Sequence, residues 1–188
     1  NDYDLPNEQA YCETCASVGM VFWNQRMNSL TGNAEYIDVL ERSLYNGALD
    51  GLSLSGDRFF YGNPLASNGK HARREWFGTA CCPANIARLI ASLGNYIYGY
   101  KDNKIYVNLF IGSQTSFMLP KGEMQFTMNT NYPWEGKVQC ILNMKKKMNA
   151  TIALRLPGWA NGTVAPGGLY SFAETNITKP TLFINGMS

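Results

Sequence analysis

Apolar side chains recur at helical spacing along the first part of the 188-residue chain. This spacing predicts a helix that Asn7 can cap and that Gly32 ends. Its expected apolar stripe comprises Tyr11, Val18, Phe22, Met27 and Leu30. A second helix is predicted over residues 34–49, with its stripe at Tyr36, Val39, Leu40 and Leu44. The first hundred residues are therefore expected to be mainly helical.

Two further elements are predicted before residue 100. Short β runs flank Ser55, Gly56 and Asp57, which predicts a hairpin over residues 52–62. A third helix is predicted over residues 81–100. Proline is favourable at the first helical position, so Pro83 places Cys82 near the N-cap of this helix.

The period of the apolar pattern falls to about two beyond residue 100. Alternating runs predict short strands within residues 104–112, 123–130, 137–144 and 150–158, with turns between them. The tail adds one clear strand, over residues 181–185. Strands of this length and spacing are typical of an antiparallel β-sandwich. The pattern thus indicates an α+β chain with two domains, residues 1–100 and 101–188.

The composition is that of an ordinary globular protein, 45% hydrophobic and 16% charged, with a net charge of +2. Because the basic residues are scattered, the chain lacks the clustered basic face that nucleic-acid binding requires. No apolar stretch approaches the roughly 18 residues that cross a bilayer. Aromatic residues make up 13% of the chain, which suits a carbohydrate-handling protein. We therefore expect neither a nucleic-acid nor a membrane partner.

The chain opens with Asn1 and carries no charged and then apolar leader. We expect it to be a fragment that begins part-way through a longer pattern. Because the expected fragment lacks its N-terminal segment, the sequence does not determine the compartment. We expect the bacterial periplasm or cytoplasm.

Four of the five cysteines fall in two close pairs, which suggests a metal site. Cys81 and Cys82 precede a helix, where backbone N–H groups favour the thiolate and lower the thiol pKa. Cys12 and Cys15 form a C-x-x-C pair and share one face if the segment is helical. Glu13 would converge with Cys15 only if the segment is extended or turning. The spacing leaves both ligand choices open.

The remaining candidate residues have ordinary interpretations. Cys140 alternates with apolar neighbours and is expected to be buried. His71, the single histidine, lies in a polar loop and is expected at the surface. Trp76 and Phe77 suit a sugar-stacking wall or core packing about equally.

Two other functions compete for the same thiols. A structural Cys₄ zinc site would use Cys12, Cys15, Cys81 and Cys82 and would not need Glu13. A thiol oxidoreductase would form a reversible Cys12–Cys15 disulfide and hold no metal. A carbohydrate-binding role for the β region also stays open.

Several stretches resemble the β-L-arabinofuranosidases of glycoside hydrolase family 127 and the related family 146. These stretches are "NDYDLPNE", "YCETCAS", "YIDVLERSLYNGALDGLSLSGDRFFYGNPL", "WFGTACCPANIARLIASLGNYIY" and "LRLPGW". The resemblance runs from residue 1 to about residue 159, and E-T-C and C-C-P-x-N are its most specific motifs. It implies an (α/α)₆ barrel, of which this chain would hold the C-terminal part, followed by a partial antiparallel β-sandwich.

The resemblance also implies the site. Zn²⁺ would be held by Glu13, Cys15, Cys81 and Cys82, and Cys81 would be the nucleophile of a retaining hydrolase. Glu41 and Tyr61 would contact the sugar. Cys12 stands where relatives carry a small residue, so the resemblance favours Glu13 as the ligand. The implied substrate is a plant-type, arabinose-containing oligosaccharide, although related enzymes act on other sugars; a homodimer is left open.

In the family the acid/base glutamate precedes the "NDYDLPN" stretch, outside this chain. We therefore expect the isolated chain to be catalytically incomplete. Helix faces and strand edges normally covered by the remainder would be exposed, so we also expect self-association.

Overall fold

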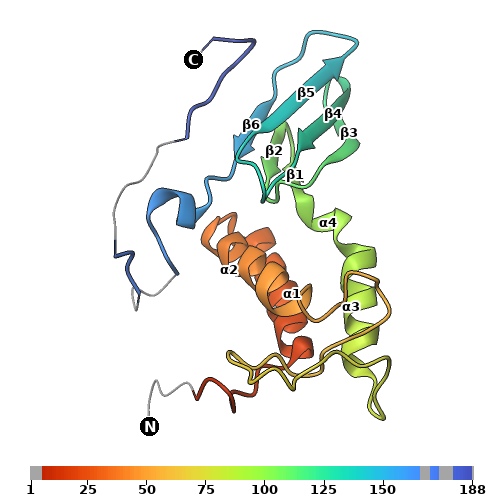
Figure 1. Cartoon of the computed structure of the whole chain (residues 1–188). Helices are drawn as coiled ribbons and strands as arrows, with labels where there is room; N and C mark the ends of the chain where they lie inside the picture. Colours follow the sequence, from red (N-terminus) through yellow and green to blue (C-terminus); the bar gives the residue numbers. More distant parts are fainter. Residues whose placement is uncertain (1–5, 166–169, 174–179, 188) are drawn as a thin grey trace. The chain divides into compact units, whose positions relative to one another are not determined.

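The computed structural model describes residues 6–165, 170–173 and 180–187 (Figure 1). Its helices are α1 (Thr14–Thr31), α2 (Glu35–Ser43), the π-helical η1 (Leu44–Ala48), α3 (Cys81–Ser92), α4 (Gly94–Ile97) and the 3₁₀ turn η2 (Gly158–Asn161). Its strands are β1 (Tyr98–Lys101), β2 (Lys104–Val107), β3 (Ser113–Leu119), β4 (Gly122–Thr130), β5 (Val138–Met144) and β6 (Thr151–Leu154). The chain divides into two compact units, Asn1–Ser92 with Leu156–Ser188, and Leu93–Arg155.

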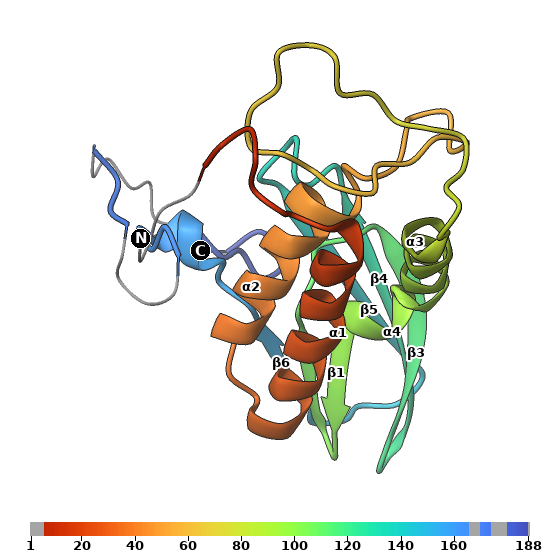
Figure 2. The ribbon, with the colours of Figure 1, turned by 90° about the horizontal axis from the view of Figure 1, so that it is seen from below.

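The first unit is built on α1, with α2 and α3 packed against it (Figure 2). Its core consists of residues that are at most 2% exposed: Val18, Val21, Ile37, Leu40, Leu44, Ala48, Cys82, Ile86 and Leu89. Each fully buried aliphatic side chain of this kind contributes roughly 1.5–3 kcal/mol. The core therefore fixes the start of α3 against α1, which is where the predicted thiols lie.

The first predicted helix is confirmed at its end and corrected at its start. Gly32 adopts a left-handed conformation, with φ 70°, and its N–H bonds to the carbonyl of Asn28 at 2.7 Å. The helix begins at Thr14 rather than near Asn7, because Glu13 is extended and pairs with Gly62. The expected stripe is wrong at its two ends, because Tyr11 is 78% and Leu30 81% exposed, whereas Val18 at its centre is buried.

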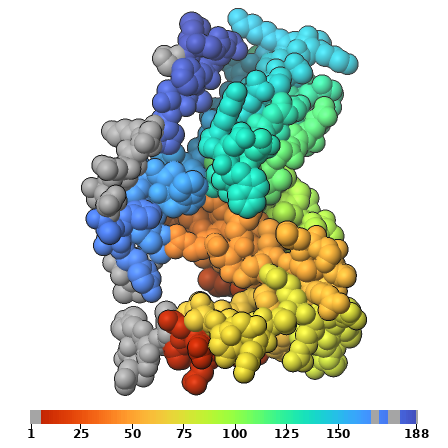
Figure 3. All heavy atoms as spheres, in the orientation of Figure 1, coloured from red at the N-terminus to blue at the C-terminus, as the bar shows by residue number. Residues whose placement is uncertain are grey.

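The segment between η1 and α3 is a long loop, within which the predicted hairpin is reduced to a turn closed by the antiparallel bridge between Leu52 and Phe59. Isolated bridges join Phe59 to Leu52 and to Arg74, and no strand forms within residues 49–80. The loop is tied to the start of the chain: Asn63 donates its N–H to the carbonyl of Cys12 at 2.8 Å. In the space-filling view it forms a layer of atoms (yellow) beside the red start of the chain (Figure 3).

The third predicted helix is shorter than expected. α3 begins at Cys81 itself and ends at Ser92, and after the single turn α4 the chain becomes strand β1 at Tyr98. Residues 98–100 were expected to be helical, but they pair antiparallel with β2 instead. Alternating aromatic residues and glycine suit a strand better than a helix, and the long-range pairing decides the outcome.

The second unit contains two three-stranded sheets, ordered β1-β2-β6 and β3-β4-β5. The second sheet is antiparallel throughout. β2 and β6 are parallel, so the expectation of antiparallel pairing is wrong for this pair. Strand β3 was not predicted. Side chains from both sheets share one core, formed by Ile97, Ile105, Val107, Phe110, Phe117, Leu119, Met124, Phe126 and Met128.

Other expectations have mixed outcomes. The mixed helix-and-sheet class is confirmed, while the (α/α)₆ barrel and the sandwich stay predictions. Cys140 is only half-buried, packed against the core of the second unit. The predicted strand over 181–185 is reduced to an isolated bridge between Ile184 and Met187. Within the described ranges, no helix has the length and apolarity to cross a bilayer.

Candidate metal centre

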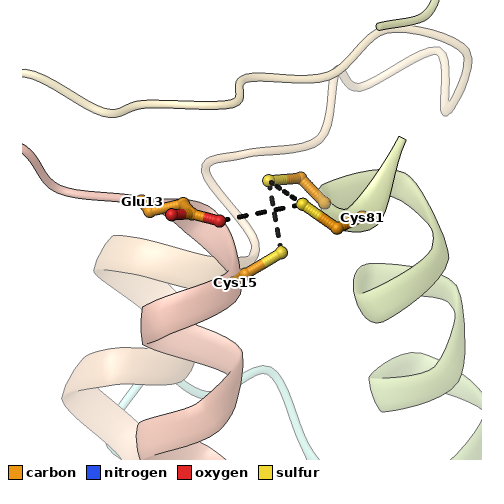
Figure 4. Close-up of side chains that lie close together, drawn as sticks. Glu13, Cys15 and Cys81 are labelled. Carbon is orange, nitrogen blue, oxygen red and sulfur yellow. Dashed lines mark hydrogen bonds between the residues drawn. The ribbon is translucent and has the colours of Figure 1, made fainter. Parts of the chain in front are cut away.

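Glu13, Cys15, Cys81 and Cys82 come together in the first unit. One ligand atom of each lies within 4.8 Å of those of the other three. Cys15 is in the first turn of α1, and Cys81 and Cys82 open α3, so both helices point their N-termini at the cluster (Figure 4). Positive helix ends favour negative ligands such as thiolates and carboxylates.

The backbone of Glu13 explains why this carboxylate reaches the thiols. Glu13 is extended, with φ −72° and ψ 134°, and immediately precedes the helix. Its bridge to Gly62 and the bond from the Thr14 N–H to the Tyr61 carbonyl, at 2.9 Å, hold it in that conformation. This is the extended geometry that the sequence required for Glu13 and Cys15 to converge.

Two of the three short distances between ligand atoms match a tetrahedral ion, and the Cys15–Cys82 distance is shorter than a tetrahedral edge. Cys82 Sγ lies 3.3 Å from Cys15 Sγ and 3.8 Å from Cys81 Sγ, and Cys81 Sγ lies 3.7 Å from Glu13 Oε1. A tetrahedral zinc with ordinary bond lengths has S···S edges of about 3.8 Å and S···O edges of about 3.6 Å. The donor set and two of these spacings therefore suit zinc.

Burial controls the protonation of two of the thiols. Desolvation raises the pKa of Cys82, and its hydrogen bond with Cys15 raises that pKa further. Desolvation also raises the pKa of Cys15, against an opposing hydrogen bond from Asn85. For Cys82 this contradicts the lowered pKa predicted from the helix N-terminus, because burial outweighs the helix. A bound cation would displace these protons.

Two tyrosines border the cluster. Tyr11 donates its hydroxyl to Glu13 Oε2 at 2.8 Å. Hydrogen bonds with Tyr11 and with Cys81 raise the pKa of Tyr61. Its backbone carbonyl lies 3.8 Å from Cys82 Sγ. The structure thus brings the predicted Tyr61 to the cluster. Tyr11 was missed as a site residue, although its position two residues before Glu13 was a usable signal.

The sequence matches two family profiles. Residues 1–95 match "Beta-L-arabinofuranosidase, GH127 catalytic domain", and residues 104–188 match the "GH127 middle domain". The chain belongs to glycoside hydrolase family 127. The family suggested by the quoted motifs is therefore confirmed.

Individual GH127 relatives are similar over most of the chain. A non-reducing end β-L-arabinofuranosidase of Bifidobacterium longum subsp. longum is 39% identical over 178 residues, which cover 86% of this chain. Among solved structures, a GH127 β-arabinofuranosidase superposes with a TM-score of 0.88 at 48% identity, covering 93% of this chain. A GH127 β-L-arabinofuranosidase from Geobacillus stearothermophilus T6 gives 0.78 at 43% identity, covering 84%. This chain spans 27% of the length of each of the three.

Glu41 of the GH127 chain lies outside the four-residue cluster. It is on α2, 4% exposed, and its Oε2 accepts a hydrogen bond from Trp159 Nε1 at 3.3 Å. The neighbouring turn is also fixed to α2, because the Gly158 N–H donates to Asp38 Oδ2 at 3.1 Å. These contacts hold the Glu41 carboxylate in place, and its contact with sugar stays a prediction.

Cys12 faces a different part of the GH127 chain. It lines a hollow of about 250 Å³ together with Ser17, Arg42, Ser43, Asn46, Gly47, Asn63 and Leu65. Its sulfur is not part of the metal-competent group, and Cys12 and Cys15 are both free thiols. Glu13 rather than Cys12 thus lies with the three thiols, and its role as a metal ligand stays a prediction.

The loop residues near the cluster take other roles. His71 is exposed, stacks on Phe60 with ring centroids 4.6 Å apart, and lies 2.8 Å from the Gly62 carbonyl. This agrees with a surface position. Trp76 is 63% exposed, which argues against core packing, whereas Phe77 packs edge-on against Tyr61 at 5.7 Å.

Proposed function

We propose that this chain carries the metal centre and the nucleophile of a retaining β-L-arabinofuranosidase. Zinc would be held by Glu13, Cys15, Cys81 and Cys82. The observation that carries the proposal is the convergence of three sulfurs and one carboxylate from two distant segments, with their ligand atoms within 4.8 Å of one another. Membership of GH127 supports the reaction class.

Cys81 is the proposed nucleophile. Its thiolate attacks the anomeric carbon, the glycosidic C–O bond breaks, and the departing oxygen takes a proton; water then displaces the sulfur, with net retention. Bound zinc would keep the thiolates ionised at neutral pH and make the Cys81 sulfur a better leaving group. We assign the acid/base role to no residue of this chain.

The sugar would lie over the open side of the cluster, next to Tyr61. The Tyr61 carbonyl lies 3.8 Å from Cys82 Sγ, and the Tyr61 hydroxyl would bond to a sugar hydroxyl. Glu41 is proposed as a second sugar contact, although its carboxylate is bound to Trp159 in this structure. The proposed substrate is a β-linked L-arabinofuranoside of plant-type oligosaccharides.

The test is the zinc content per chain after anaerobic purification, for wild type, Cys12→Ala and Glu13→Gln. We expect about one zinc per chain in wild type and in Cys12→Ala. Glu13→Gln should weaken zinc binding by more than about tenfold, since even an outer-shell partner is worth that much. Competition with a chelator measures the change.

The opposite pattern would replace this proposal with another. If the zinc content falls in Cys12→Ala and is unchanged in Glu13→Gln, the site is a structural Cys₄ site. A metal-free wild-type chain with a reversible Cys12–Cys15 disulfide would indicate thiol redox chemistry.

A further inference from the structure

Asn85 joins the two helices that carry the thiols. It lies four residues after Cys81, on α3, and its Nδ2 donates to Cys15 Sγ of α1 at 3.1 Å. The contact reaches one sulfur of the cluster directly.

Arg88 sets the orientation of the Asn85 amide. Its Nη2 donates to Asn85 Oδ1 at 2.9 Å. A guanidinium can only donate hydrogen bonds, so the amide oxygen must face Arg88 and the amide NH₂ must face the sulfur. Arg88 is itself placed over the ring of Phe22, with Cζ 4.8 Å from the ring centroid. The orientation of the amide thus follows from the chemistry of its two neighbours.

The sulfurs of Cys15 and Cys82 have different hydrogen-bond partners. Cys15 accepts an N–H bond, which favours a negatively charged sulfur. Cys82 Sγ faces the carbonyl oxygen of Tyr61 at 3.8 Å, an acceptor that favours the protonated thiol. Of these two contacts, only the N–H donor stabilises a thiolate, so Asn85 is suited to act on Cys15.

We propose that Asn85, oriented by Arg88, is a positioning residue that holds Cys15 in place as a thiolate ligand of the metal. This inference rests on the proposed metal centre. Outer-shell partners of this kind fix the direction of a ligand and typically account for 10–100-fold in metal affinity.

The experiment measures cobalt binding to the chain, because Co²⁺ reports thiolate ligation by its sulfur-to-metal absorption. Asn85→Leu keeps the shape of the side chain and removes the donor. It should weaken Co²⁺ binding by about 10–100-fold and alter the sulfur-to-metal absorption. Arg88→Leu frees the amide to turn over and should cause a smaller loss. The matched control is Asn46→Leu on η1, whose amide donates to the carbonyl of Arg42 at the end of α2; it should leave binding unchanged.

The outcomes distinguish a failure of the proposed role of Asn85 from a failure of the proposed metal centre. A wild-type chain that takes up no Co²⁺ overturns both. Wild-type binding with unchanged affinity and absorption in Asn85→Leu overturns the role of Asn85 alone, as does an equal loss in Asn46→Leu. If Asn85→Leu fails to fold by circular dichroism, Arg88→Leu decides, because Arg88 is exposed; an unchanged Arg88→Leu then overturns the inference.

Discussion

An activated aryl β-L-arabinofuranoside should transfer one pentosyl group to Cys81 of the zinc-loaded chain. The sulfur of Cys81 forms the new bond to the anomeric carbon, the C–O bond to the aryl group breaks, and the aryl oxide leaves with the electron pair. Because an acidic phenol leaves without protonation, this step needs no general acid. It can therefore be observed with this chain, or with any longer polypeptide that includes it.

Intact mass spectrometry gives the number of pentosyl groups, and fragmentation of the peptide that contains Cys81 and Cys82 locates them. We expect labelling in wild type and none in Cys81→Ala. Cys140→Ala is the matched control, because Cys140 is a free thiol in the other unit and should not affect labelling. Cys12→Ala should also label normally.

Cys81→Ala removes a proposed zinc ligand as well as the nucleophile, so its loss of labelling needs a second measurement. The second measurement is the position of the pentosyl group in the wild-type chain, which is expected on Cys81. An adduct on Cys15 or Cys82, or a wild-type chain that acquires none, would contradict the assignment of Cys81.

The three thiols of the proposed site were predictable as candidates from sequence, whereas the carboxylate beside them was not. Close spacing and the position before Pro83 are local signals, and both pairs of cysteines stood out for that reason. The choice of Glu13 over Cys12 depends on the extended backbone at Glu13, which is held by pairing with Gly62. No local pattern records a contact between residues so far apart, and only the family resemblance favoured Glu13.

The same distinction explains the helix boundaries. The end of α1 was predictable because Gly32 alone supplies the left-handed conformation that ends the helix. The start was not, because Asn7 is a good capping residue by type, yet the chain before Thr14 is occupied by contacts with the loop. Tertiary contacts override a local preference of about 1 kcal/mol.

The sheets show what an alternating pattern leaves undetermined. Alternation identifies a strand and its buried face, but says nothing about the direction of its partner. β6 follows β5 in the chain and pairs with β2 in parallel. β3 escaped detection because its first half, Ser113–Ser116, is polar, and only its second half buries Phe117 and Leu119.

The largest loss of stability is expected for Phe126→Ala in the second unit. Phe126 lies on β4 and is 0% exposed. Its ring packs edge-on against Tyr98 and Phe117, with centroids 5.3 Å and 6.2 Å away. Truncating a fully buried phenylalanine removes its transfer free energy and leaves a cavity, which together cost about 3–5 kcal/mol.

Denaturant unfolding followed by circular dichroism measures the change in the free energy of unfolding. The matched control is Ile141→Ala on the adjacent strand β5, where the side chain is 39% exposed and the cost should stay below about 1.5 kcal/mol. All four proposed zinc ligands lie in the first unit, so zinc content under native conditions should be unchanged in both variants. Equal losses of stability in the two variants would contradict the placement of Phe126 at the centre of this core. Loss of zinc in Phe126→Ala alone would show instead that the metal centre depends on the folding of the second unit.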